Sequence, residues 1–299
     1  MVNSIYIPFL IAIFSSFIWS LMNVLDKYII SHKVKNIFSF AIIAGALNLF
    51  IGLILALFLN WNNINLIDLL FPVLVGIIAG SQFFVYYLIL QKEDISKVIG
   101  LIYFYPVIVA FLSFLFLNER LSLISYVGVS LILLGALLLS INKRKLILNI
   151  SLWMILLLIF MIGLQEFFIK IATDNLSILN GVSITSIFIG LVIMFGLFNK
   201  KTRLDLKFEL KNIKWACFSE ILTFLGIFTV YISMLYLPAT IVSSIGAVQP
   251  LFVLFLESFL NKRGLLLTLE KFSLKKVMSI LLIVLGVFLL YLPEVLFLN

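Results

Sequence analysis

The sequence predicts an all-α integral membrane protein with ten transmembrane helices in two inverted five-helix repeats, and three observations carry this prediction. Of the 299 residues, 64% are hydrophobic and only 11% are charged. Apolar segments of about 20 residues, the length that crosses a bilayer, follow one another along the chain. Lysine and arginine gather in every second loop between these segments. Because soluble domains are about 45–50% apolar and about 25% charged, the composition excludes a cytosolic enzyme, a disordered chain and a disulfide scaffold.

The apolar segments are predicted to be helices, because the alternating pattern of a membrane β-strand is absent from them. Charged or turn-forming residues mark the breaks between them, for example the runs 32–36 and 142–145. The first segment has no charged residues before it and no small-residue cleavage site, so we expect a retained helix rather than a signal peptide. In order, the expected spans are 5–25, 38–59, 70–90, 97–117, 122–141, 150–170, 178–198, 215–236, 240–260 and 274–293.

The basic residues predict the orientation of these spans. Of the 21 lysine and arginine residues, 19 lie in the loops after the first, third, fifth, seventh and ninth spans. Loops rich in lysine and arginine stay in the cytoplasm, so both termini of this multi-pass protein of the cell membrane are expected outside. The net charge of +8 therefore reflects membrane topology, and nucleic acid is not expected as a partner.

The two halves of the chain resemble each other, which predicts an internal repeat. The segment 96–106 matches 240–250 at an offset of 144 residues, and both segments end in proline. Five spans per half is an odd number, so the second half enters the membrane from the opposite side, and the loop charges of the two halves are reversed accordingly. We expect one repeat in residues 1–145 and another in residues 146–299, an architecture typical of alternating-access carriers.

Three parts of the sequence are similar to an EamA-type domain: the run from Leu101 to Ala110, the polar stop Asn118-Glu119-Arg120, and the run from Tyr236 to Pro250. The chain therefore resembles EamA-type transporters of the drug/metabolite transporter superfamily over both halves. This resemblance implies ten helices, two inverted repeats and transport of small metabolites such as amino acids, with relatives that carry nucleotide sugars or sugar phosphates. The sequence departs from the family pattern at Lys262-Arg263, where a Glu-Arg-Leu stop is usual. It also departs in its expected termini, which family members generally place in the cytoplasm.

Polar side chains inside the spans are the candidates for a solute site, because a buried amide, phenol or carboxyl needs a partner that a water-filled cavity supplies. On the third span Gln82 and Tyr86 lie one turn apart on one face, as do Trp19 and Asn23 on the first span. Glu166 takes the place of Asn23 in the second half, at an offset of 143 residues. The expected substrate-binding residues are Trp19, Asn23, Gln82, Tyr86, Tyr103, Glu166, Ser244 and Gln249.

Three glutamates within the spans are candidates for ion coupling, namely Glu166, Glu220 and Glu257, because an ionisable group at the bilayer centre costs about 2.5–3.5 kcal/mol on insertion scales. A structural role stays open for each of them. Glu166 can pair with Lys170 at i+4, and the other two lie near span ends, within reach of headgroup water or a basic loop. If transport is coupled to protons, Glu166 is the first candidate and Glu257 the second.

Pro106 and Pro250 occupy equivalent positions in the two halves and are expected to be hinges. A proline within a transmembrane helix leaves a carbonyl one turn upstream without its donor and permits a bend, with a static kink as the alternative. Gly128, Gly135 and Gly286 are expected to allow close helix packing rather than to bind a ligand.

These features favour a secondary transporter that moves a small organic metabolite, an amino acid or similar, by alternating access. A strongly anionic phosphate substrate is less favoured, because few buried cations are available. No cofactor, metal or enzymatic activity is expected, since the sequence has no phosphate-binding glycine loop, metal-ligand cluster or nucleophile motif. The alternatives are a membrane-embedded lipid-modifying enzyme and a structural membrane subunit. The expected partners are the small-molecule substrate and the lipid bilayer; proton coupling, direction of transport and the choice between monomer and homodimer stay open.

Overall fold

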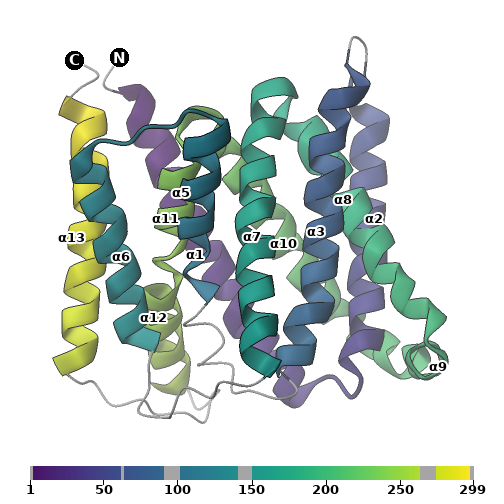
Figure 1. Ribbon diagram of the computed structural model, residues 1–299. Coiled ribbons are helices and arrows are strands. Elements are labelled where there is room, and N and C mark those ends of the chain that lie inside the picture. The colour runs from purple at the N-terminus through teal and green to yellow at the C-terminus, as the bar shows by residue number, and fades with distance from the viewer. Residues whose placement is uncertain (1–2, 62–63, 91–101, 141–149, 263–273, 297–299) are drawn as a thin grey trace.

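The computed structural model describes residues 3–61, 64–90, 102–140, 150–262 and 274–296, and these residues form a bundle of helices without a strand (Figure 1). The first half contributes α1 (Asn3–His32), α2 (Ile37–Phe58), α3 (Leu66–Leu90), α5 (Tyr105–Phe116) and α6 (Leu123–Ser140). The second half contributes α7 (Ile150–Asn175), α8 (Ile178–Met194), α9 (Lys200–Glu209), α10 (Ile213–Tyr236), α11 (Ala239–Gly246), α12 (Gln249–Lys262) and α13 (Leu274–Leu296). Short 3-10 turns, η1 (Phe195–Phe198) and η2 (Leu210–Asn212), flank α9.

Membrane-spanning helices dominate this bundle. Within the described residues, seven helical segments are long and apolar enough to cross a bilayer, and α5 and α6 contribute shorter apolar helices. The chain is therefore a multi-pass, all-helical membrane protein.

Helix α1 is longer than the first span expected from hydropathy, because it continues without a break to His32. No proline or glycine lies between residues 9 and 32, so the drop in hydropathy after Leu25 ends the apolar stretch but not the helix. Asp26 therefore lies inside the helix, about one turn beyond Asn23 and on the same side of it.

Helix α9 forms within the segment expected to be a basic loop after the seventh span. The Glu209 carboxylate, only 1% exposed, accepts hydrogen bonds from the backbone N–H groups of Lys35 at 2.9 Å and Asn36 at 3.0 Å. The Asn36 amide in turn donates to Asp205 Oδ2 at 2.8 Å. Carboxylates at a helix N-terminus are stabilising, so these contacts fix α9 against the start of α2.

Both predicted hinge prolines lie at breaks in helical structure. Helix α5 begins at Tyr105 and Pro106 after a turn, and two residues, Ala247 and Val248, separate α11 from α12 just before Pro250. In each half, the carbonyl two residues before the proline accepts a hydrogen bond from the N–H of the residue after the proline, at 3.0 Å. The same local turn therefore recurs at equivalent positions of the two halves.

Helices α2 and α8, the second helix of each half, pack against each other and run in opposite directions. The Asn180 amide at the start of α8 donates to the Asn60 carbonyl just after α2, at 3.0 Å. The Ser39 hydroxyl at the start of α2 donates to the Thr202 carbonyl of α9, which follows α8, at 2.7 Å. Equivalent helices that cross the bundle in opposite senses are what an inverted repeat requires.

Helices α6 and α13, the last of each half, also pack antiparallel to each other. Gly128 faces Gly286, and a Cβ atom on Gly286 would lie 2.6 Å from the Gly128 carbonyl oxygen. Further along the pair, Gly135 faces Ser279 and Ile283. The close approach expected of these glycines is therefore present, because no side chain could be added without moving the backbones apart.

The two halves interlock rather than lying side by side. Helix α1 packs against α10, and α3 packs against α7. Leaving the short α9 aside, the first helix of each half therefore contacts the third helix of the other half. The start of α1 and the end of α13 lie at one end of the bundle, the terminal end, and α9 lies at the opposite end, the α9 end (Figure 1). The interior between the halves is where the candidate site lies.

Candidate functional site

A cavity of about 320 Å³ lies between the two halves of the chain. Its wall includes side chains of α1, α2 and α3 from the first half and of α7, α8 and α10 from the second half. Seven of the eight residues expected to bind substrate line it: Trp19, Asn23, Gln82, Tyr86, Tyr103, Glu166 and Gln249.

Helical spacing explains why these side chains meet. On α1, Trp19, Asn23 and Asp26 lie at intervals of four and three residues, which places them in one stripe facing the cavity. On α3, Gln82 and Tyr86 form an equivalent stripe. Each helix therefore presents one polar face inward while its other faces pack against neighbours or lipid.

Gln249 links three elements at the break between α11 and α12. Its Oε1 atom accepts from the Asn23 amide at 3.3 Å and from the Tyr103 hydroxyl at 3.4 Å. Its backbone carbonyl accepts from the Ser20 hydroxyl of α1 at 3.2 Å. The residue expected to bind substrate is therefore also the point where α1 and the turn before α5 meet the broken helix.

Hydroxyl groups satisfy the backbone carbonyls near this break. The Ser16 hydroxyl donates to the Ile245 carbonyl at 2.9 Å, and the Tyr105 hydroxyl donates to the Ser243 carbonyl at 3.1 Å. Irregular backbone at membrane depth needs such partners, because lipid offers none. These bonds make the break between α11 and α12 a stable part of the cavity wall.

Glu220 of α10 lies in the cavity wall with its carboxylate bonded to a neutral side chain. The Asn48 amide of α2 donates to Glu220 Oε2, and both residues are buried, at 2% and 6% exposure. Asp26 of α1 lines the same cavity, and α1 packs against α10. Two carboxyl groups from α1 and α10 therefore share one region of the cavity.

Glu166 of α7 lies in the cavity wall beside the Tyr105 hydroxyl. Its Oε2 atom is buried and has no hydrogen-bond partner among the described residues. The ion pair that the sequence allowed between Glu166 and Lys170 is not formed, because the Lys170 ammonium group binds Asp174 Oδ1 at 3.1 Å and the Met234 carbonyl at 2.9 Å. Glu166 is thus left to face the cavity.

Two of the predicted residues do not line the cavity as described. Ser244 is fully buried, and its hydroxyl donates to the Thr240 carbonyl of the same helix at 2.6 Å. The side chain of Glu257, on α12, lies outside the described part of the chain.

Sequence reasoning missed Asp26 and Asn48. Asp26 stands seven residues after Trp19 and three after Asn23, which puts it on the same face of α1, but the first span was ended at residue 25. Asn48 is an amide in the middle of an apolar span, and that isolation is the signal that could have found it.

The cavity lies toward the α9 end of the bundle. Phe40 in its wall is only three residues from the start of α2, which is about 4.5 Å along the helix. Tyr86 is four residues from the end of α3, and Glu220 is seven residues from the start of α10, both at the same end.

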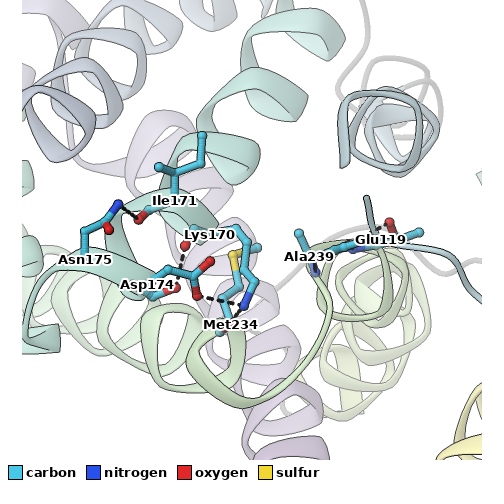
Figure 2. Close-up of polar contacts among 9 residues, drawn as sticks. Glu119, Lys170, Ile171, Asp174, Asn175, Met234 and Ala239 are labelled. Atoms are coloured by element: carbon cyan, nitrogen blue, oxygen red, sulfur yellow. Dashed lines mark hydrogen bonds and ion pairs between the residues drawn. The ribbon is translucent and has the colours of Figure 1, made fainter. Parts of the chain in front are cut away.

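Polar contacts join neighbouring elements at the terminal end (Figure 2). The Glu119 carboxylate accepts from the backbone N–H of Ala239 at 2.9 Å, which joins the α5–α6 linker to the start of α11 (Figure 2). Lys170 of α7 reaches the Met234 carbonyl near the end of α10 (Figure 2). A carboxylate at a helix N-terminus and an ammonium at a helix C-terminus both have favourable charge, so these contacts stabilise the packing at the terminal end.

Comparisons with known proteins match this architecture. Residues 7–141 and residues 149–292 each match the model of the EamA-like transporter family. No curated protein matches the sequence at a significant level. A solved chain described as "Crystal structure of protein" is similar over 95% of this chain and 98% of its own length, with a TM-score of 0.71 and 13% sequence identity. At that identity the likeness shows a shared fold alone.

Proposed function

Because this chain belongs to the EamA-like transporter family, we propose that it is a secondary carrier that moves a small organic solute, an amino acid or similar, across the bilayer by alternating access. One observation carries the proposal: a cavity of about 320 Å³ is lined by both halves of the chain. Buried polar atoms without partners, such as Gln82 Nε2 and Glu166 Oε2, face this space, and a bound solute or water would satisfy them.

The alternating step would use the helix breaks. The turns before Pro106 and Pro250 lie in or next to the cavity wall, so a bend there would move α5 and α12 relative to the rest of the bundle. Rocking of α3, α5 and α10–α12 would then break the Glu119 contact and open the terminal end while closing the α9 end. Proline as a static kink is the competing interpretation.

Ten spans in two inverted repeats, residues 1–145 and 146–299, complete this proposal. The α9 end, where the basic segments 33–36 and 199–214 lie, would face the cytoplasm and both termini would lie outside. A reporter fused after Asn299 tests this orientation: activity only outside the cell supports it, and cytoplasmic activity contradicts it.

Filling the cavity tests the carrier function directly. Ala79 of α3 lines the cavity, whereas Ile77 on the same helix is 38% exposed on the outer surface. Proteoliposomes with Ala79→Trp are expected to lose solute flux, measured with a panel of labelled amino acids and amines. The matched control Ile77→Trp should keep it. Equal flux in both variants would contradict transport through this cavity.

Proton coupling, if present, would act through the carboxyl groups of the cavity. Glu166 is the first candidate, because its Oε2 atom is buried without a partner among the described residues. Glu257 is the second candidate and Glu220 the third. Neutralising each to glutamine and measuring uptake across a pH gradient tests the idea, and unchanged gradient-driven uptake in all three variants would rule it out.

The two other functions fit the site less well. A lipid-modifying enzyme would need clustered acid and base groups at headgroup level, and the described cavity wall holds carboxyl groups without a histidine. A structural subunit would need only a dry interface between the halves, whereas Asn23, Gln82 and Gln249 make this one polar.

A further inference from the structure

The cavity is acidic. Its described wall contains three carboxyl side chains, those of Asp26, Glu166 and Glu220, and no lysine, arginine or histidine. An anionic solute would meet like charge in a low-dielectric site and would leave these groups without a counter-charge.

Asp26 and Glu220 form the strongest feature of this wall. Glu220 is 6% exposed, and Asn48, which donates a hydrogen bond to its carboxyl group, is neutral. Asp26 and Tyr86 line the same cavity as Glu220, and α1, which carries Asp26, packs against α10, which carries Glu220. Among the side chains that the structure describes, no cation pairs with either carboxyl group, so a cationic ligand can supply the positive charge that balances them.

The fold does not require an acid at this place. At the repeat offset of 143 residues, Asp26 corresponds to Ile169, which also lines the cavity. The equivalent helix therefore packs with an isoleucine at the same position. A carboxyl group within a membrane helix costs free energy, and only the first half carries one at this position. Asp26 therefore points to a bound ligand.

The rest of the wall suits an organic cation. Trp19, Phe40, Phe83 and Tyr86 supply aromatic faces, which attract ammonium groups through their quadrupoles. Gln82 Nε2 is a buried donor without a partner among the described residues, which an acceptor on the ligand or a bound water would satisfy. A volume of about 320 Å³ lies at the small end of ligand pockets, which fits a small solute.

We propose that the solute is a small protonated amine whose ammonium group is held between Asp26 and Glu220, with its apolar part against the aromatic wall. The inference rests on the proposed carrier function and adds the chemical class of the solute. Zwitterionic amino acids satisfy it through their amino group, whereas carboxylates and phosphates without an amine do not.

Binding to the purified protein tests this proposal with probes that share a phenyl ring on a short carbon chain: 2-phenylethylamine, phenylalanine amide, phenylalanine, 2-phenylethanol and 3-phenylpropionate. Calorimetry should show the amines binding about tenfold or more tightly than the alcohol or the acid. Equal or tighter binding of 3-phenylpropionate, or binding of none of the amines, would overturn the proposal.

Variants locate the ammonium site. Asp26→Asn and Glu220→Gln should each weaken binding of phenylalanine amide by about tenfold or more, because each removes one negative charge. Asp26→Glu keeps the charge and should keep the preference for amines, which separates loss of charge from misfolding. Asp68→Asn is the matched control, since Asp68 lies in the first turn of α3 outside the cavity wall. Amine binding that Asp26→Asn and Glu220→Gln leave unchanged would overturn the proposal.

Flux measurements separate this inference from the carrier function beneath it. If Ala79→Trp abolishes flux of a neutral or anionic solute that Asp26→Asn and Glu220→Gln do not affect, the chain is a carrier and the amine site is wrong. If Ala79→Trp leaves every flux unchanged, the carrier function itself is wrong.

Discussion

At the scale of single residues, the Asn48–Glu220 pair is the clearest case of a polar contact that packing alone does not explain. Both side chains are buried in a membrane bundle, and each satisfies the other. Removing one partner leaves a buried polar group alone, which costs more than removing both.

This asymmetry gives a prediction for a double-mutant cycle. Asn48→Leu should lower the free energy of unfolding by about 1–3 kcal/mol, because the Glu220 carboxyl loses its donor. The double variant Asn48→Leu/Glu220→Leu should recover part of that loss. Unfolding by a denaturing detergent, followed by circular dichroism, measures both. Strictly additive effects would show that the two side chains are not coupled.

The side of a helix on which a residue lies can be predicted from sequence where helical spacing alone decides it. Trp19, Asn23 and Gln82 line one cavity, as their spacing predicts, and substrate binding by them stays a prediction. Helical spacing does not decide the partner of Lys170, which has carboxylates available at both i−4 and i+4. Its ammonium group reaches the Met234 carbonyl toward the terminal end, so a tertiary contact that local spacing does not contain selects Asp174 over Glu166.

At the scale of elements, the proposed motion depends on the helix breaks at the two prolines. Pro250 prevents a continuous helix from α11 through α12, because it lacks the backbone N–H that a helix uses. Pro250→Ala restores that donor and should favour one straight helix. We expect solute flux to fall roughly tenfold, a barrier increase of about 1.4 kcal/mol, while solute binding stays within a factor of about two. Initial rates in proteoliposomes and calorimetry measure the two quantities, and unchanged flux would support a static kink.

Helices α6 and α13 provide a prediction about packing. Gly286→Leu should lower the free energy of unfolding by about 1–3 kcal/mol, because its Cβ atom would overlap the Gly128 carbonyl of α6. Val284→Leu on the same helix is the control, since Val284 is 57% exposed and should change stability by less than about 0.5 kcal/mol. Thermal unfolding in detergent compares them. Equal stability of the two variants would mean that the helices do not pack at this glycine pair.

Element boundaries were predictable where hydropathy and helix breakers coincide, and were missed where they do not. The end of α10 at Tyr236 was expected, because a proline follows closely at Pro238. Hydropathy predicts that the first span ends at residue 25, although no helix-breaking residue lies there and α1 continues. For this reason the sequence prediction leaves Asp26 out of the candidate site. Helix α9 is not predicted, because its mostly polar sequence gives no hydropathy signal for a membrane span. Its position depends on hydrogen bonds between Glu209 and a turn that is distant in the sequence.

At the scale of the whole molecule, the antiparallel pairing of equivalent helices relates the two ends of the bundle. The contacts at the terminal end therefore have an equivalent region at the α9 end, toward which the cavity lies. Under the proposed alternating access, the cavity would open to the terminal end when the contacts there break. The Glu119–Ala239 contact joins the two halves at that end and is the point to hold closed.

Reversible cross-linking across this contact tests the central claim most directly. The pair Arg120→Cys and Pro238→Cys flanks the contact, with the chain's one cysteine, Cys217, first replaced by serine. A short bifunctional methanethiosulfonate reagent joins the pair, and the single variant Arg120→Cys treated alike is the control. Flux in proteoliposomes should fall to background in the cross-linked protein and return after reduction. Flux that continues at the uncross-linked rate with the terminal end held closed would contradict alternating access through the cavity between the two halves.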